Sequence, residues 1–218
     1  MCEGAAIVAD ICLRMCRRES STFNTPVYPK EITPLTDQAQ ADAWRDAIFD
    51  AFQEADIAQV AYVPDAGHKR LIERTHTANG MRAMSVATEE DAVACLAGAW
   101  LGGQKGALLM QSSGVGNTIN MLSLAKTCQF PMPMFITMRG EWGEFNSWQM
   151  QMGETTQAHL ELSGVKCYRC ETPEDVAETV RVAIDQAYNG NCQTAVLLAQ
   201  KLVGTKKFSD GGLGDNKK

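Results

Sequence analysis

The sequence has 218 residues, of which 45% are hydrophobic and 21% charged, and this composition argues against a disordered, collagen-like or coiled-coil protein. The net charge of −6, without a long basic cluster, makes nucleic acid an unexpected partner. No apolar run reaches the roughly 18 to 20 residues that cross a bilayer, so we expect no membrane association and a cytoplasmic location. At about 150 residues per domain, the length predicts one domain with appendages.

Residues 1–36 are predicted to form an irregular N-terminal arm. The second half of this stretch contains three prolines among Ser, Thr and Asn residues and shows no sustained helical or strand period. A helix is expected after Asp37, because four apolar side chains fall on one helical face: Trp44, Ile48, Ala51 and Phe52.

Short apolar segments then alternate with helical periods to the end of the domain. Strands are expected near residues 58–63, 82–86, 107–111, 134–138, 165–169 and 194–199. These strands lack polar alternation, which indicates that both faces of the sheet are covered. The pattern predicts an α/β fold over residues 37–203, a doubly wound, mainly parallel sheet of about six strands flanked by helices. Residues 204–218 are predicted to be a flexible tail.

The cysteines do not form an obvious site. Eight are scattered through apolar stretches, and only Cys167 and Cys170 have CxxC spacing. No second CxxC or nearby histidine accompanies them, so a structural pair on a strand is favoured over a zinc or redox role. The three histidines make no recognisable triad or metal set, and no resident metal ligand is predicted in this chain.

Ligands of doubly wound sheets bind beyond the carboxyl ends of the strands, so the loops there are the candidate site. One of them contains the glycine turn Ser112–Asn117 at a strand-to-helix junction, where backbone N–H groups can face an anion. The turn lacks the third glycine of a dinucleotide fingerprint and a Walker lysine, so a purely structural turn remains an alternative. Glu89 and Glu90 begin a helix, where carboxylates stabilise the helix dipole.

Three segments, Thr88–Ala92, Ala97–Gly103 and Ala107–Asn120, resemble the pyrimidine-binding domain of thiamine-diphosphate-dependent 2-oxoacid decarboxylases. Within that superfamily the chain is most similar to sulfopyruvate decarboxylase α subunits and to phosphonopyruvate decarboxylases. The resemblance covers residues 36–203. It includes Val63-Pro64-Asp65 and Arg139-Gly140, and its most specific element is a glutamate at a helix start followed by the glycine turn.

The resemblance implies a catalytic glutamate that hydrogen-bonds N1′ of the aminopyrimidine of the cofactor. Counting ten residues back from Trp100 places this role on Glu90, with a dipole-stabilising role as the alternative. The other cofactor-binding positions are those of the glycine turn: Ser113, Gly114, Val115, Gly116 and Asn117.

The resemblance also implies a second subunit. Related enzymes bind the diphosphate and its Mg²⁺ through a Gly-Asp-Gly motif that these 218 residues do not contain. We therefore expect a diphosphate-binding β subunit, an α2β2 or larger assembly, and activity only in the complex.

The resemblance favours sulfopyruvate as the substrate, converted to the aldehyde and carbon dioxide. Phosphonopyruvate or an aromatic 2-oxoacid is the first alternative, since Trp142, Phe145 and Trp148 could line an apolar pocket, and a non-catalytic binding subunit is the second. Candidate substrate contacts are Asp65, His68, Gln111, Arg139 and Gln149. For His68 a solvated helix start, and for Arg139 an anchor for its own loop, remain open as alternatives.

Overall fold

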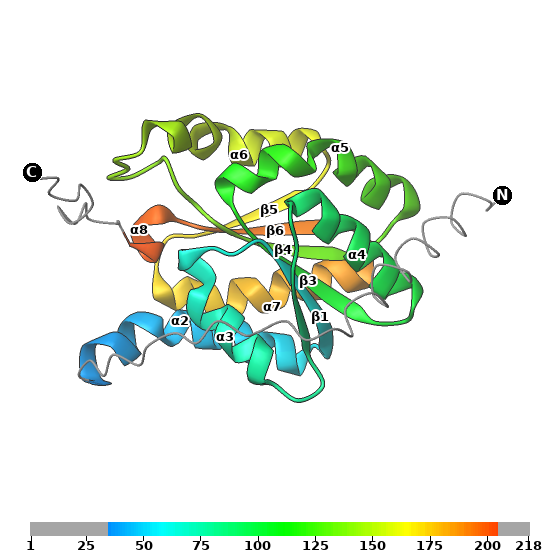
Figure 1. Ribbon diagram of the computed structural model, residues 1–218, viewed down its shortest axis with the longest axis horizontal. Helices are drawn as coiled ribbons and strands as arrows, with labels where there is room; N and C mark the ends of the chain where they lie inside the picture. The colour runs from blue at the N-terminus through cyan, green and yellow to red at the C-terminus, as the bar shows by residue number, and fades with distance from the viewer. Residues whose placement is uncertain (1–34, 205–218) are drawn as a thin grey trace, which may run out of the picture.

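The computed structural model describes residues 35–204, and these form one six-stranded sheet with helices on both faces (Figure 1). The predicted arm, apart from its last two residues, and the predicted tail, apart from Gly204, lie outside the described residues. The strands are β1 (Ile57–Tyr62), β2 (Arg82–Ser85), β3 (Lys105–Gln111), β4 (Met132–Thr137), β5 (Lys166–Cys170) and β6 (Gln193–Leu198). The helices are α2 (Leu35–Glu54), α3 (Lys69–Thr77), α4 (Glu89–Leu101), α5 (Ser112–Cys128), α6 (Met150–Leu162), α7 (Pro173–Gly190) and α8 (Gln200–Val203), with short 3₁₀ turns at Ala66–His68 and Ser147–Gln149.

The described strands all pair in parallel, in the order β2-β1-β3-β4-β6-β5. Helices α2, α3 and α7 lie on one face of the sheet, and α4, α5 and α6 lie on the other (Figure 1). The predicted doubly wound α/β fold is therefore confirmed. Because the strands are parallel, their carboxyl ends meet at one edge, where ligands of such sheets bind.

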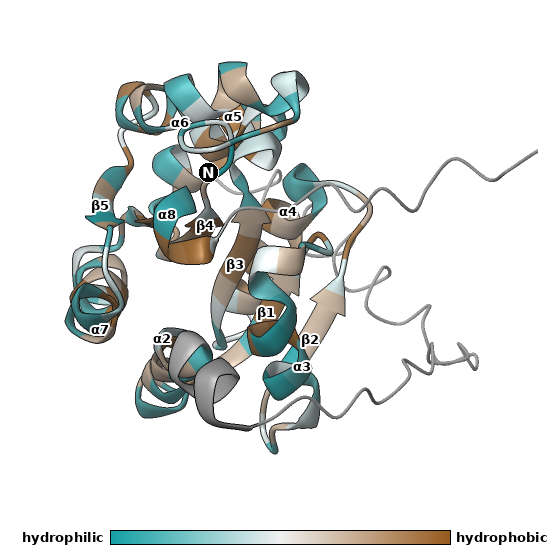
Figure 2. Cartoon of the chain, turned by 90° about the vertical axis from the view of Figure 1, so that its left-hand side faces the viewer, coloured by the Kyte–Doolittle hydropathy of each residue, from teal (hydrophilic) through white to brown (hydrophobic). Residues whose placement is uncertain are grey.

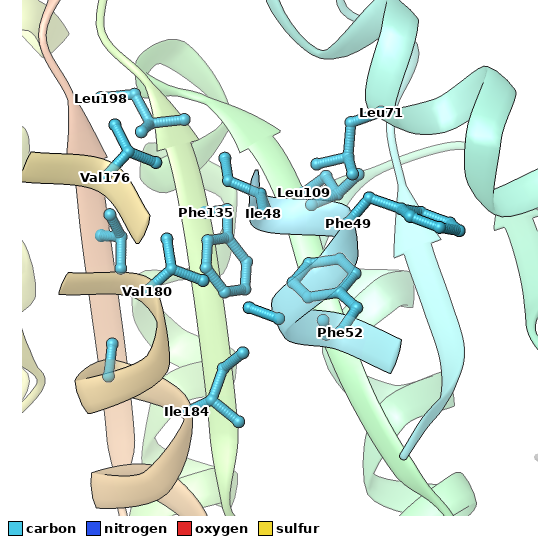
Figure 3. Close-up of a cluster of buried hydrophobic side chains, with 14 of the residues drawn as sticks. Ile48, Phe49, Phe52, Leu71, Leu109, Phe135, Val176, Val180, Ile184 and Leu198 are labelled. Carbon is cyan, nitrogen blue, oxygen red and sulfur yellow. The ribbon is translucent and has the colours of Figure 1, made fainter. Parts of the chain in front are cut away.

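The face covered by α2 and α7 holds the aromatic part of the core (Figure 3). Ile48 and Phe52 of α2 are completely buried, as their spacing predicted, and the Phe52 ring meets Phe135 of β4 edge to face at 4.9 Å between centroids. From α7, Val180 and Ile184 pack into the same cluster. This packing fixes α2, and with it the loop that leaves β1.

The opposite face buries aliphatic side chains and methionines beneath α4, α5 and α6. Met110, Met134 and Ile136 are completely buried there. Figure 2 shows the two helical layers with the hydrophobic strands between them. Methionine fills irregular gaps in a core, and Met132 and Met138 are buried in the same way.

Cys167 and Cys170 are three residues apart on β5, so their side chains point to opposite faces of the sheet. Cys170 is buried against the α2 and α7 side, and Cys167 packs against the other. Burial raises the pKa of both thiols, that of Cys167 to about 11. The pair therefore cannot share a ligand, in agreement with the structural interpretation.

Two helices begin earlier than their apolar periods predict, which would start them near Val115 and Glu154. Helix α5 starts at Ser112, directly after β3, and α6 starts at Met150 after a 3₁₀ turn. The first shift places the whole glycine turn inside the opening turns of α5. Within the described residues, no helix is both long and apolar enough to cross a membrane.

Candidate functional site

The carboxyl edge of the sheet brings together the starts of α4 and α5. Thr88 caps α4 in an extended conformation, and the next residue, Glu89, is the first of the helix. Its side chain is 7% exposed and lies directly against the Cα atom of Gly114, so that a methyl group at position 114 would overlap the carboxylate. Asn117 donates a hydrogen bond from Nδ2 to Oε2 of Glu89, at 2.8 Å. Gly114 and Asn117 thus form a seat for one buried carboxylate.

Glu90, the predicted catalytic residue, does not take part in this seat. Its side chain is exposed, whereas Glu89 lies on the buried face of α4 with Ala92, Val93 and Leu96. The difference follows from the helical period, since Glu89 precedes two buried positions by three and four residues. The prediction counted from Trp100 is therefore one position away from the glutamate that faces the glycine turn.

Asp65 links the ends of three strands. It follows β1, and its carboxylate accepts hydrogen bonds from Gln111 Nε2 of β3 at 2.9 Å, from Thr137 Oγ1 of β4 at 2.7 Å and from the backbone N–H of Gly67 at 3.0 Å. Burial raises the pKa of Asp65, but the nearby His68 ring and these three bonds outweigh it and hold the pKa below its usual range. Asp65 is therefore ionised, and both of its carboxylate oxygens accept hydrogen bonds.

Gln111 extends this network toward the glycine turn. While its Nε2 donates to Asp65, its Oε1 accepts the hydroxyl proton of Ser113 at 2.8 Å. The Ser113 hydroxyl is therefore directed back to β3, and its oxygen keeps free lone pairs. The structure brings Asp65, Gln111 and Ser113 together, as expected for residues at neighbouring strand ends.

His68 is neither a solvated helix start nor exposed at the edge. It is 1% exposed, and its Nε2 lies 3.0 Å from the backbone oxygen of Phe135, which can only accept a hydrogen bond. Nε2 therefore donates, and burial, partly offset by Asp65, lowers the pKa of the ring. This geometry contradicts the solvated helix start, because the ring supports β4 from inside the domain.

Arg139 anchors its own loop, which was one of the two interpretations left open. Its guanidinium makes a two-pronged ion pair with Glu144, from Nε at 2.6 Å and from Nη2 at 2.7 Å. Gln200, just after β6, donates to Glu144 at 2.9 Å and accepts from the N–H groups of Glu141 and Trp142. The loop after β4 is thus fastened to the sheet at several points.

The same loop presents aromatic side chains outward. Trp148 is 87% exposed, and Trp142 and Phe145 are about half exposed. Gln149, a candidate substrate contact, has a buried side-chain oxygen without a hydrogen-bond partner among residues 35–204. Its backbone packs closely on Gly140, which has a positive φ of 78°.

The Arg139–Glu144 pair predicts a pH-dependent stability. The hydrogen bond from Arg139 holds the pKa of Glu144 at about 2, below its ordinary 4.5, and the side chain is 2% exposed. Because the folded-state pKa is lowered, the stabilisation is present above pH 4.5 and is lost as the pH falls toward 2. We expect the free energy of unfolding, measured with urea, to fall across this range less steeply in Glu144→Gln than in the wild type. If the free energy of unfolding fell equally steeply with pH in both proteins, Glu144 would not be the source of this pH dependence.

A cavity of about 190 Å³ opens near the ends of β1 and β4. It is lined by Arg45, Asp65, Ala66, Gly67, Thr137, Arg139, Val203 and Gly204. Glu89 does not line it, so the cavity is separate from the carboxylate seat. In the part of the chain that the structure describes, no group of three or more His, Cys, Asp or Glu side chains could hold a metal ion.

The loops predicted to form the site thus meet at the carboxyl edge of the sheet, but several of their polar partners were not predicted. Glu89 could have been found by extending the apolar face of α4 back from Ala92 and Val93. No such signal marks Thr137 and Gln200, because their hydrogen-bond partners Asp65 and Glu144 are 72 and 56 residues away. Glu144 lies only five residues from Arg139, but it meets the guanidinium because the loop between them folds back. Among the turn residues, Gly114 and Val115 are buried, while Gly116 and Asn117 are exposed.

No family model matches the sequence. The chain is 33% identical over 152 residues to the sulfopyruvate decarboxylase subunit alpha of Methanocaldococcus jannaschii, which covers 69% of this chain and 90% of that one. It is 32% identical over 154 residues to the same subunit of Methanococcus maripaludis, with 70% and 92% covered. The phosphonopyruvate decarboxylase of Streptomyces viridochromogenes is 38% identical over 108 residues, 49% of this chain and 27% of that one.

Among solved structures, the chain is similar to the 2-oxoglutarate:ferredoxin oxidoreductase of Magnetococcus marinus, solved with 2-oxoglutarate, coenzyme A and succinyl-CoA bound. The TM-score is 0.57, and the match covers 73% of this chain and 29% of that one. At 12% identity this likeness concerns the fold alone.

Proposed function

Because this chain belongs to the family of sulfopyruvate decarboxylase α subunits, we propose that it is the pyrimidine-binding subunit of a thiamine-diphosphate-dependent decarboxylase acting on sulfopyruvate. The reaction consumes one proton and converts the 2-oxoacid to the corresponding aldehyde and carbon dioxide. The observation that carries the proposal is the buried Glu89 carboxylate, seated on Gly114 and Asn117 at the carboxyl edge of the sheet.

The seat suits the pyrimidine half of thiamine diphosphate. No hydrogen bond to Oε1 of Glu89 is found among the described residues, while Oε2 is held by Asn117. A buried carboxyl group with one unengaged oxygen can share a proton with a ring nitrogen such as N1′. In this proposal Glu89 takes the role that the sequence suggested for Glu90, and it holds that proton at N1′.

Thiamine diphosphate, when bound, supplies a nucleophilic thiazolium carbon and an electron sink for decarboxylation. The side chains of this subunit bind and orient the cofactor. Ser113, with its proton directed to Gln111, offers an acceptor oxygen at the start of α5, and Asp65 keeps Gln111 in place. Asp65 and Arg139 are the candidate substrate contacts that line the cavity at the ends of β1 and β4.

We assign the diphosphate and Mg²⁺ to a partner subunit, in an α2β2 or larger complex. Two features support this assignment. The relatives are named alpha subunits, and the 218 residues contain no Gly-Asp-Gly motif. The exposed Trp142, Phe145 and Trp148, on a loop fastened by Arg139 and Gln200, are the side chains proposed to meet that partner, since exposed aromatic groups are enriched at interfaces.

Reconstitution tests the proposal. The chain is co-expressed with a β subunit that carries Gly-Asp-Gly, and carbon dioxide release is measured from sulfopyruvate, phosphonopyruvate and an aromatic 2-oxoacid. We expect turnover of sulfopyruvate by the pair and none by either chain alone. Turnover of phosphonopyruvate instead would favour the substrate alternative, which the Streptomyces relative supports. Assembly with cofactor bound but no turnover of any acid would favour the non-catalytic alternative.

A further inference from the structure

Asn117 is the one described residue that donates a hydrogen bond to the carboxylate of Glu89. It lies in the second turn of α5, 28 residues further along the chain, and its own side chain is exposed. This hydrogen bond therefore links the buried carboxylate of Glu89 on α4 to an exposed side chain on α5. Gly114, one turn earlier in α5, supplies the opposite wall of the seat.

The chemistry of the two groups fixes both orientations. An ionised carboxylate only accepts hydrogen bonds, so the amide must turn Nδ2 toward Glu89 and direct Oδ1 elsewhere. The last torsion of a glutamate side chain has a broad energy profile, and Gly114, although it lies against Oε1 and Cδ, offers no side chain to hold the carboxylate plane. The donor on Oε2 fixes this plane and leaves Oε1, beside Gly114, as the oxygen without a hydrogen bond among residues 35–204.

We infer that Asn117 is a positioning residue, which sets the plane of the Glu89 carboxylate so that Oε1 meets N1′ of the aminopyrimidine. This inference rests on the proposed function. It assigns to Asn117 an action through Glu89, without contact with the reacting atoms. The consequence is that affinity for the cofactor depends on the donor at position 117.

The test is Asn117→Asp in the complex reconstituted with the β subunit, with thiamine diphosphate affinity measured by calorimetry. The substitution preserves shape but replaces the donor with a carboxylate, so at about pH 8 we expect affinity to fall roughly tenfold or more. At about pH 5 the introduced carboxyl, whose proton is favoured by the neighbouring carboxylate, becomes a donor and part of the affinity returns. Asn117→Ala should lose affinity at both pH values.

Asn120→Asp is the matched control, because it places the same charge on an exposed position of α5, one turn away from Asn117. We expect its cofactor affinity to stay within about twofold of the wild type. Equal affinities for Asn117→Asp and Asn120→Asp would overturn the inference. A loss in Asn117→Asp that is the same at both pH values, or that follows a fall in melting temperature, would also overturn it.

Glu89→Gln separates this inference from the proposed function. If Glu89→Gln is inactive while Asn117→Asp binds cofactor like the wild type, only the positioning role is wrong. If Glu89→Gln and Asn117→Asp both behave like the wild type, the proposed site itself is wrong.

Discussion

Glu89→Gln is expected to lower kcat of the reconstituted decarboxylase by about 100-fold or more, the usual effect of removing a general acid–base group. Glutamine has almost the same shape and fits against Gly114, so the fold is retained. Its amide cannot share a proton with N1′ as a carboxyl group does. The measurement is carbon dioxide release at saturating cofactor and substrate, with circular dichroism to verify the fold.

Glu90→Gln is the matched control for this variant. It removes the same charge from the same helical turn, but Glu90 is exposed, whereas Glu89 is buried. We expect kcat within about twofold of the wild type, as for most surface substitutions. Should Glu90→Gln lose activity while Glu89→Gln keeps it, the partner subunit would have to cover Glu90, and the catalytic role would return to that residue.

Gly114→Ala is expected to abolish most activity while leaving stability nearly unchanged. The three atoms nearest to the added methyl group all belong to the Glu89 side chain, a flexible group that can swing away. Alanine in a helix is also favoured over glycine by up to about 1 kcal/mol. Displacing Glu89 costs about 100-fold in kcat, whereas the free energy of unfolding should change by no more than about 1 kcal/mol.

Gly116→Ala is the variant with which Gly114→Ala is compared. A methyl group there would meet only the Met152 thioether, at an ordinary contact distance of 3.5 Å, and the position is exposed. The two substitutions add the same group to the same helix two residues apart. If both variants keep full turnover in the reconstituted complex, the Glu89 seat does not contribute to catalysis.

The fold was predictable because its sheet is buried on both faces. Apolar runs such as Ala107–Met110 indicated covered parallel strands. Boundaries were less accurate at Ser112 and Met150, where each helix starts before its apolar period becomes visible. Polar first turns carry little periodic signal, so residues at helix starts, where this site lies, are the hardest to place.

The candidate site was predictable as a set of loops and less so as a set of side chains. Motif spacing pointed to Glu90, whereas the glutamate that packs against Gly114 is its neighbour Glu89. The position of Arg139 next to a strand end was evident, whereas its ion pair with Glu144 depends on how the intervening loop folds back. Such contacts arise from tertiary structure and have no local pattern.

The order of the strands also constrains when during synthesis the domain can be completed. Strand β6 is the last in the sequence, yet it lies between β4 and β5, so β5 gains its neighbour in the sheet only after residue 198 has been made. Gln200, which holds Glu141 and Glu144, follows two residues later. Pairings between strands distant in sequence form slowly, so a ribosome-bound chain that stops before β6 should expose the unpaired edge of β4. The sheet of this subunit, and with it any surface that binds a partner, can therefore be completed only after the last strand of the domain has been synthesised.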